Sequence, residues 1–439
     1  MQRRSALLGL AIGLALADSS VVTLALPDIL RDYDVSITTV AWVLTSYNLV
    51  LALLAVPAAF VARRRPVPAF FTGIGIFAIA SLFCGLAPSF DALIAGRTLQ
   101  ALGGALVITA ALDLLSEIED GVAPALHIWV VAGVVGAAVG PAVGGLLTQT
   151  LGWQSIFLAQ VPLALITILG VRNVAAHRLP RPAGRPAIGP NLALLLLSGG
   201  LVAALFLVVL LLVDGWSMSP ALAGLVVSVM PIAAITTSRL AHLAGTTKLR
   251  AATGVVLVTG GLGALALLPG ASWQWTIAPQ ILVGAGLGLA IPALTEWALR
   301  DAPDQVVHGG WAIASRHAGV VLGLVLLAPL LAHTLDHNRT LALNAGTASV
   351  LDSTIPPLQK LGVAQDVLAE VDRASGSLPD VAAAFNDRPD TPEYRSLLTT
   401  LEDQLNRAVT SAFSLPFALA ALLAALALAP VAIHRSRAP

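Results

Sequence analysis

Two oppositely charged residues lie within long apolar stretches, where an ionisable side chain is costly and usually functional. Asp18 and Arg97 lie in the stretches that begin near residues 5 and 91. If these stretches cross a bilayer in opposite directions, the two side chains reach nearly the same depth, because a helix rises about 1.5 Å per residue. Protonation of Asp18 would then release Arg97. The pair therefore predicts coupling of a proton to a conformational change, with a static structural ion pair as the alternative.

A second polar group lies in the apolar stretch from residue 308 to 333. Arg316 could bind an anionic group or pair with a carboxylate, and a purely structural role is an equal alternative. His317 alone is more often a packed or hydrogen-bonded side chain than a proton carrier. Other polar and aromatic residues could line a central cavity together with Arg316 and His317. The Tyr and Trp residues among them could instead anchor the helices at the membrane interface. These polar and aromatic residues are Trp42, Ser46, Tyr47, Asn48 and Gln100.

Charged residues also lie near the inner ends of several apolar stretches. Arg63 and Arg64 follow the second stretch, and Asp113 lies near the end of the fourth. An acid and a base here could form an inner gate, or both could lie among lipid headgroups. We expect the gate role for these three residues and an ordinary surface role for Glu296.

The composition identifies the elements that must position these residues as membrane-spanning helices. Of 439 residues, 57% are hydrophobic and 11% are charged, whereas a soluble domain has about a quarter charged residues. Apolar runs long enough to cross a bilayer predict an all-α integral membrane protein with two six-helix bundles. The twelve predicted spans lie near residues 5–27, 38–62, 67–88, 91–114, 124–148, 154–172, 191–213, 219–243, 251–270, 275–299, 308–333 and 411–434. The first is expected to be retained rather than cleaved as a signal peptide.

The basic residues predict the topology. With a cytoplasmic N-terminus, the inner segments collect the basic residues and the short outer loops hold Arg31 alone, in agreement with the positive-inside rule. We therefore expect a multi-pass protein of the cell (inner) membrane with both termini cytoplasmic. The predicted parts are an N-terminal bundle (1–172), a proline-rich cytoplasmic linker (173–190), a C-terminal bundle (191–334 and 411–434) and a cytoplasmic tail (435–439).

The segment from 335 to 410 is rich in acidic residues and is predicted to be a long extracytoplasmic loop before the last helix. Apolar residues within 392–407 have helical spacing, so this part is expected to be a helix that runs into the last span. The segment could be a solvated cap with no direct role. Alternatively, it could shield an outer vestibule and guide a departing substrate.

The sequence also argues against several classes of function. Zero net charge gives no support to nucleic acid as a partner. The single cysteine, Cys84, lies in an apolar run and suggests no redox role. No cysteine–histidine cluster has metal-ligand spacing, and no nucleophile–base pair stands out. We therefore expect neither an enzyme nor a metal or cofactor site.

A stripe of glycines runs along the predicted span 124–148. At about 100° per residue these glycines share one helix face, on which a neighbouring helix can approach closely. Pro141 has no N–H to donate to the carbonyl of Ala137, so the helix is expected to bend there. The stripe alone predicts only a close-packed helix pair. Its glycines are Gly133, Gly136, Gly140 and Gly144, with Gly145 beside them.

Several motifs resemble those of the major facilitator superfamily, in particular its drug:H+ antiporter (EmrB/QacA-like) branch. The glycine stripe with its proline resembles the GxxxGPxxGG motif, and residues 18–27 (DSSVVTLALP) resemble the first-helix DxTxxxxALP motif. Residues 42–47, 93–103 and 152–157 are similar to further motifs of the first half, and the resemblance is looser in the second half. It implies alternating access, with Asp18 as the proton-responsive acid, Arg97 as its partner and the glycine–proline helix as the bend and seal of the outward gate.

The chain departs from this branch in two ways. Members of the branch usually have fourteen spans, whereas twelve are predicted here. The inner loop has Ala58, Ala62 and Arg65 where the family pattern has glycine, aspartate and glycine. Because the acid that should clamp the inner gate is missing, either other residues close that gate or the transport cycle is altered.

Together these features predict a proton-coupled exporter of amphipathic or hydrophobic small molecules. We expect a monomer that uses the proton gradient as its energy source, with the substrate, protons and the lipid bilayer as its partners. One alternative is an exporter or flippase of an endogenous lipid or hydrophobic metabolite. Another is a protein with a transporter fold that acts as a sensor or scaffold without transporting.

Overall fold

The computed structural model describes residues 2–171, 174, 182–300, 302–373, 381–386, 388–389 and 391–433. Twelve helical segments among these residues are long and apolar enough to cross a membrane, and they confirm the predicted spans. Helices satisfy every backbone polar group within the segment itself, which an apolar bilayer requires.

The N-terminal half contains six of these segments. They are formed by α1 (Gln2–Thr23), α3 (Ile37–Val40) with α4 (Trp42–Ala62), α5 (Pro66–Gly85), α6 (Phe90–Ile118), α7 (Val122–Leu151), and α8 (Gln154–Thr167) with the 3-10 turn η1 (Ile168–Val171). The short helix α2 (Leu26–Asp32) connects the first two. Local sequence sets several helix starts: Pro66 occupies the first turn of α5, and the Ser89 hydroxyl caps α6 by accepting from the Ala92 N–H at 3.2 Å.

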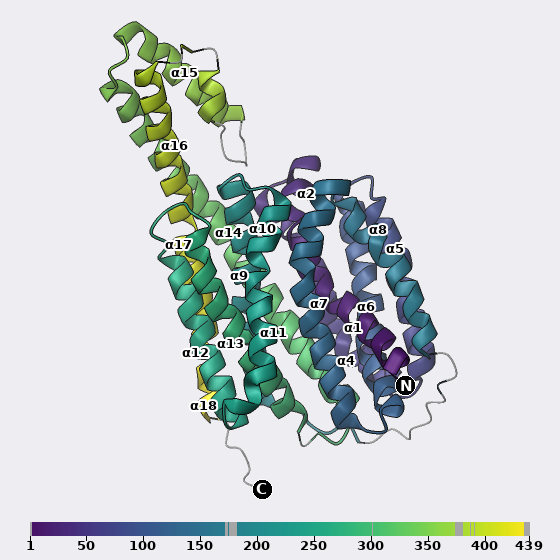
Figure 1. Ribbon diagram of the computed structural model, residues 1–439. Helices are drawn as coiled ribbons and strands as arrows, with labels where there is room; N and C mark the ends of the chain where they lie inside the picture. The colour runs from purple at the N-terminus through teal and green to yellow at the C-terminus, as the bar shows by residue number, and fades with distance from the viewer. Residues whose placement is uncertain are drawn as a thin grey trace.

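The C-terminal half contains the other six. They are formed by α9 (Ile188–Leu210) with η2 (Leu211–Gly215), α10 (Pro220–Val227) with α11 (Val229–Leu240), α12 (Thr247–Ala266), α13 (Gln274–Leu299), α14 (Gln305–Asp352), and α17 (Ser414–Leu426) with α18 (Leu428–Ile433). The 3-10 turn η3 (Ala241–Leu243) follows α11. The two halves lie side by side (Figure 1). They meet where α4 packs against α14 and where α7 packs against α10 and α11.

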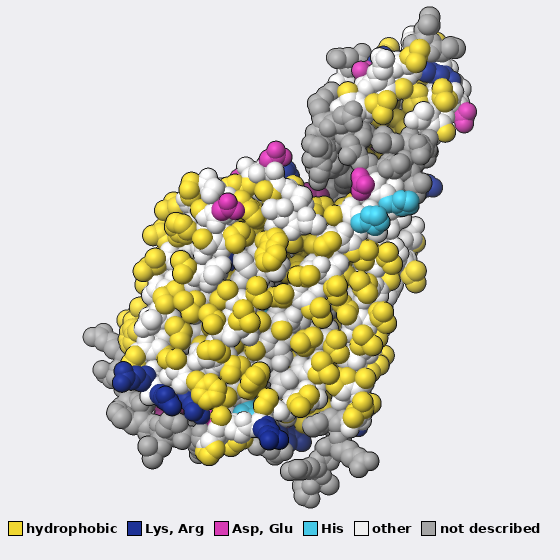
Figure 2. Space-filling view, turned by 180° about the vertical axis from the view of Figure 1, so that it is seen from behind, with side chains coloured by type: hydrophobic (Ala, Val, Ile, Leu, Met, Phe, Trp, Pro, Cys, Tyr) yellow, Lys and Arg dark blue, Asp and Glu magenta, His cyan; other side chains and the backbone are white. Residues whose placement is uncertain are grey.

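The surface has the pattern of a membrane protein. On the face shown in Figure 2 a broad apolar area covers the bundle. Basic side chains lie along its lower edge, and further ones lie on the segment that projects from the top. The start of α1 and the final described helix at the other end of the sequence both lie toward this lower end of the bundle (Figure 1), as expected for an even number of spans.

The segment predicted as a long loop consists of helices where the structure describes it. Helix α14 extends over 48 residues and leaves the bundle, and the chain returns through α15 (Pro357–Arg373), η4 (Val381–Phe385) and α16 (Pro392–Ala412), which leads into α17. A small hydrophobic core, which includes Val363, Phe385 and Leu397, holds this helical hairpin together. The hairpin projects away from the bundle beside the C-terminal half (Figure 1). The expected helix within 392–407 is confirmed as part of α16.

Candidate functional site

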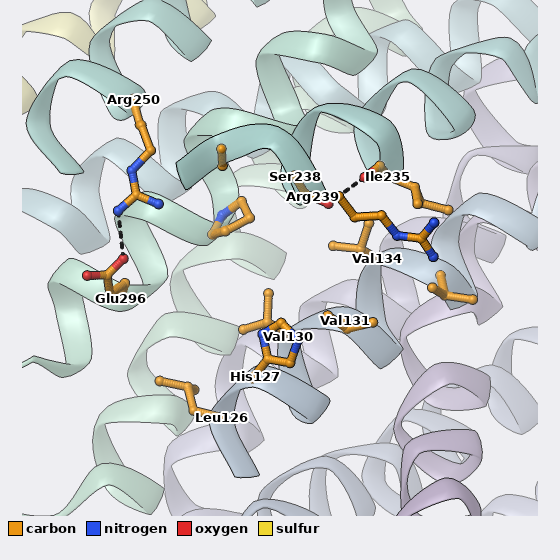
Figure 3. A pocket seen from close by; sticks show the side chains of 13 residues that line it. Leu126, His127, Val130, Val131, Val134, Ile235, Ser238, Arg239, Arg250 and Glu296 are labelled. Atoms are coloured by element: carbon orange, nitrogen blue, oxygen red, sulfur yellow. Dashed lines mark hydrogen bonds and ion pairs between the residues drawn. The ribbon is translucent and has the colours of Figure 1, made fainter. Parts of the chain in front are cut away.

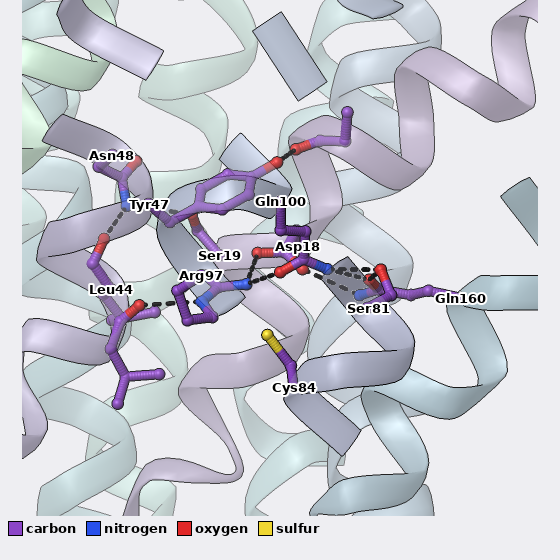
Figure 4. A network of polar contacts seen from close by, with 12 residues as sticks. Asp18, Ser19, Leu44, Tyr47, Asn48, Ser81, Cys84, Arg97, Gln100 and Gln160 are labelled. Atoms are coloured by element: carbon purple, nitrogen blue, oxygen red, sulfur yellow. Dashed lines mark hydrogen bonds and ion pairs between the residues drawn. The ribbon is translucent and has the colours of Figure 1, made fainter. Parts of the chain in front are cut away.

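The two ionisable residues singled out in the first half form an ion pair. Asp18 on α1 and Arg97 on α6 are both 0% exposed, and Arg97 Nη1 donates directly to Asp18 Oδ2 (Figure 4). The prediction that they lie at one depth is therefore confirmed. A buried pair of this kind is stable only when further hydrogen bonds satisfy both groups.

Arg97 makes further contacts besides its ion pair with Asp18. Its Nε donates to the Val43 carbonyl at 3.0 Å, and Nη1 also donates to Gln100 Oε1 at 2.6 Å. The guanidinium carbon lies 4.4 Å from the centre of the Tyr47 ring, within cation–π range. Tyr47 and Gln100, expected in a cavity wall, are fully buried and support the ion pair instead. Arg97 Nη2 has no hydrogen-bond partner among the described residues.

The second oxygen of Asp18 is bound by a residue that the sequence analysis missed. Gln160 Nε2 on α8 donates to Asp18 Oδ1 at 2.9 Å. Gln100 Nε2 donates to Gln160 Oε1 at 2.6 Å and to Ser81 Oγ at 2.9 Å. Asp18, Arg97, Gln100 and Gln160 thus form a closed ring of polar contacts across α1, α6 and α8 (Figure 4). In the sequence, Gln160 was marked only as a polar residue in the middle of the apolar run 154–172.

A second chain of contacts joins this region to the other half. Asn48 Nδ2 donates to Ser19 Oγ at 3.1 Å and to the Leu44 carbonyl at 2.7 Å. His317 Nδ1 on α14 lies 2.6 Å from Asn48 Oδ1. Contacts therefore run from α1, next to Asp18, through α4 to α14.

The remaining cavity candidates occupy different surroundings. Ser46 is buried and its hydroxyl has no partner among the described residues, whereas Trp42 is exposed at the start of α4. Arg316 is partly exposed on α14 beside His317, and it has no hydrogen bond or ion pair within the described part of the chain.

The glycine stripe of α7 packs against α1, as its small residues predicted. A Cβ atom placed on Gly136 would lie 2.5 Å from the Gly13 carbonyl oxygen, and one on Gly144 would lie 2.3 Å from that of Val21. Gly133 and Gly140 face Leu16 and Ser20 of the same helix. The backbones of α1 and α7 therefore approach each other too closely for any side chain between them.

A second face of α7 packs against α10 in the other half. A Cβ atom on Gly145 would lie 2.4 Å from the Pro220 carbonyl oxygen, and one on Gly224 would lie 2.7 Å from that of Pro141. Helix α7 continues through Pro141. One end of α7 thus contacts both α1 and the opposite half.

An ion pair joins the halves at the end of the bundle that carries the termini. Arg63 Nη1, at the end of α4, lies 3.0 Å from Asp304 Oδ2, at the start of α14, and both side chains are largely buried. Asp304 was not among the predicted gate residues. Of the others, Arg64 is exposed and Asp113 is buried on α6. Glu296 pairs with Arg250 and Arg300 within the C-terminal half.

A cavity of about 560 Å³ lies between the halves where the first turns of α7 face α11. Val130, Val131 and Val134 form its apolar wall, and His127, Arg239, Arg250 and Glu296 provide polar groups (Figure 3). The opposite end of α7 is closed against α10. The interface between α7 and the other half therefore contains a cavity near the termini and is tightly packed at the other end.

Comparisons with known proteins agree with this architecture. A sequence model described as Major Facilitator Superfamily matches residues 8–337. The crystal structure of a bacterial homologue of the human lysosomal transporter Spinster, inward-facing and unoccupied, aligns over 100% of this chain and 99% of its own, with a TM-score of 0.65. At 17% sequence identity, this likeness concerns the fold alone.

Curated relatives match part of the chain. The multidrug resistance protein Stp of Mycobacterium tuberculosis is 36% identical over 168 residues, which is 36% of this chain and 30% of Stp. The drug efflux pump JefA of the same organism is 32% identical over 41% of this chain and 37% of its own. The multidrug efflux pump LfrA of Mycolicibacterium smegmatis is 35% identical over 40% of this chain and 36% of its own length. The matched segments span about a third of the length of these relatives. Because the family model covers well over half of the sequence, the chain belongs to the Major Facilitator Superfamily and is a transporter rather than an enzyme.

Proposed function

We propose that this transporter is a proton-coupled exporter of hydrophobic or amphipathic small molecules, which works by alternating access. The observation that carries the proposal is the fully buried Asp18–Arg97 pair, closed into a ring of hydrogen bonds by Gln100 and Gln160. The names of the relatives, which are drug and multidrug efflux proteins, support the substrate class.

The chemistry of the pair suggests how a proton would act. A proton on the Asp18 carboxyl removes the negative charge that balances Arg97. Arg97 then keeps its bonds to Gln100 and the Val43 carbonyl, but an unbalanced cation in a low-dielectric interior is unfavourable. The cation would gain by moving toward water or toward another polar group, and α1 and α6 would shift with it.

The packing of α1 offers a route from this shift to the gate. Because α1 and α7 touch backbone to backbone at Gly136 and Gly144, a displacement of α1 is expected to move α7. The same end of α7 seals against α10 through Gly145 and Gly224. Proton binding at Asp18 would therefore change the stability of the seal on the side away from the termini.

The other end of the bundle has its own closing contact. The Arg63–Asp304 pair holds α4 and α14 together, and it must break before the halves can separate there. The cavity between α7 and α11 would admit substrate from the end that carries the termini. We infer that this end is cytoplasmic because basic side chains lie along it on the face shown in Figure 2. We infer further that the protein resides in the cell membrane and that the monomer is the transporting unit.

The test is transport by the purified protein in proteoliposomes with an acidic lumen. We would offer two fluorescent amphiphiles, the cation ethidium and a dansyl-labelled dodecyl sulfonate. The proposal expects the wild-type protein to accumulate at least one of them against its gradient, and an ionophore that dissipates the pH gradient to abolish this. Facilitated equilibration that ignores the pH gradient would refute proton coupling. No protein-dependent movement of either probe would favour the sensor alternative.

A further inference from the structure

Arg316 points away from lipid and toward the N-terminal half. On α14 the exposed residues Trp311 (38%), Leu322 (36%), Val325 (52%) and Leu326 (41%) mark the lipid-facing side. At about 100° per residue, Arg316 lies roughly 130° around the helix from the middle of that side. Ile313, which is fully buried, and Gly309 share its face. A Cβ atom on Gly309 would lie 3.1 Å from Leu112 Cδ2 of α6, so this face of α14 meets the opposite half.

Arg316 has no counter-ion among the residues that the structure describes. It lies about 16 Å along α14 from Gln305, at about 1.5 Å per residue. Its side chain is partly exposed, and it has no ion pair or hydrogen bond among the described residues. Three acids near α14 are bound elsewhere: Asp18 pairs with Arg97, Asp304 with Arg63, and Glu296 with Arg250. Asp113 of α6 also has an interaction of its own. A partly accessible cation at membrane depth without a carboxylate is suited to bind an anion from outside the chain.

His317 supplies a second ligand group beside it. Because the Asn48 amide nitrogen donates to the Leu44 carbonyl and to Ser19, the amide oxygen is the acceptor for His317 Nδ1 at 2.6 Å. In a neutral ring this places the proton on Nδ1 and leaves Nε2 as an acceptor. His317 is only 7% exposed, and its Nε2 has no partner among the described residues. A buried acceptor without a partner is costly unless a ligand satisfies it.

We propose that Arg316 and His317 form the head-group site of the substrate, and that the substrate is an amphipathic anion. Arg316 would bind a carboxylate, sulfonate or phosphate group, and His317 Nε2 would accept from a neighbouring hydroxyl or N–H of the same molecule. The apolar body of the ligand would lie between the two halves. The inference rests on the proposed function for its assignment to a substrate, and it names the chemical class of that substrate.

The test uses three probes that differ only in the head group. Each carries the same dansyl-labelled dodecyl chain, which ends in a sulfonate, a hydroxyl or a trimethylammonium group. Binding to the full-length protein in phosphatidylcholine nanodiscs is measured by energy transfer from tryptophan to dansyl, with empty nanodiscs as the blank. We expect the wild-type protein to bind the sulfonate about tenfold or more tightly than the hydroxyl probe, as a charge-assisted hydrogen bond supplies.

The variants make the assignment specific. Arg316→Gln is expected to reduce the sulfonate-to-hydroxyl ratio to about one, whereas Arg316→Lys retains a preference for the anion because it keeps the charge. Arg31→Gln removes a cation from the far end of the bundle, where Arg31 is 53% exposed, and is expected to leave the ratio unchanged. Because the ratio is taken within one variant, a partly unfolded preparation cannot imitate the result. Equal binding of sulfonate and hydroxyl probes by wild type, or an unchanged ratio in Arg316→Gln, would overturn the inference.

Two further comparisons are needed. The first distinguishes an anionic lipid from a free amphiphile as the source of the anion, and the second distinguishes failure of the proposed function from failure of this site. Phosphatidylglycerol in the nanodiscs should displace the sulfonate probe if an anionic lipid is the natural occupant, and should leave it bound if the site takes free amphiphiles. These binding measurements need no pH gradient. A head-group preference without gradient-driven transport would therefore reject only the proposed function, and gradient-driven transport without a preference would reject only this site.

Discussion

Arg63 on α4 and Asp304 at the start of α14 form an ion pair of 3.0 Å that bridges the two halves of the transporter. The loop after α4 lacks the aspartate of the family pattern, and the acid at this end comes instead from the opposite half. Asp304 also caps α14, because its Oδ1 accepts from the Val307 N–H at 3.3 Å. One residue therefore fixes both the start of α14 and its attachment to α4.

Loss of this ion pair should loosen the end of the bundle that carries the termini. Asp304→Asn removes the charge but retains an effective helix cap. We expect it to shift the equilibrium toward separation of the halves by about 1–2 kcal/mol, or roughly five- to thirtyfold. Spin labels at Arg65 and Leu243, one exposed residue in each half, would report longer distances by double electron–electron resonance.

The matched control is Arg300→Gln, which removes an ion pair with Glu296 inside the C-terminal half. It is expected to leave the distance distribution unchanged. If Asp304→Asn also leaves it unchanged, the Arg63–Asp304 pair does not hold this end closed.

The contact between α1 and α7 should tolerate no side chain. Gly144→Ala places a methyl group 2.3 Å from the backbone oxygen of Val21, and overpacking of this kind costs about 1–3 kcal/mol. We expect a lower thermal unfolding temperature and slower transport. Gly75→Ala is the control, because nothing lies within 4 Å of the added atom. Equal behaviour of the two variants would show that the helices can separate without cost.

The geometry of Arg97 should matter as much as its charge. The guanidinium contacts Asp18, Gln100, the Val43 carbonyl and the Tyr47 ring together, and an ammonium group cannot reproduce this set. Arg97→Lys is therefore expected to reduce gradient-driven transport by at least about tenfold while the protein remains folded by size-exclusion chromatography. Normal transport by this variant would show that only the positive charge at position 97 matters, and that the geometry of the guanidinium does not.

The projecting hairpin should be dispensable for the transport step. Gln404 Nε2 donates to Ser349 Oγ at 2.7 Å, so α14 and α16 are adjacent there and a short glycine–serine linker can replace residues 350–403. The hairpin core is separate from the cores of the bundle, so the shortened protein is expected to fold and to transport within about twofold of the wild-type rate. A large loss of rate with intact folding would instead support a guiding role for the hairpin.

The Asp18–Arg97 contact could be predicted from the sequence because depth in a bilayer follows from counting residues along two antiparallel helices. The glycine stripe could be predicted because helical periodicity determines which residues share a face. Gln160 could not, since a neutral residue in an apolar run gives no sign of which helix it meets. Asp304 could not either, because its pairing with Arg63 depends on how the two halves dock. The hairpin could not be predicted as a continuous helical unit, because the polar composition after residue 335 gives no sign that α14 continues beyond the membrane span.

The central claim is that a proton on Asp18 drives transport, and Asp18→Asn tests it most directly. Proteoliposomes with an acidic lumen would be compared for accumulation of a probe against its gradient and for exchange of the same probe without any pH gradient. Asn resembles the protonated carboxyl, so we predict that the variant loses accumulation but still exchanges the probe. Asp34→Asn, at an exposed turn with φ 50° that asparagine also tolerates, is predicted to retain both. Accumulation by Asp18→Asn at the wild-type level would contradict the account.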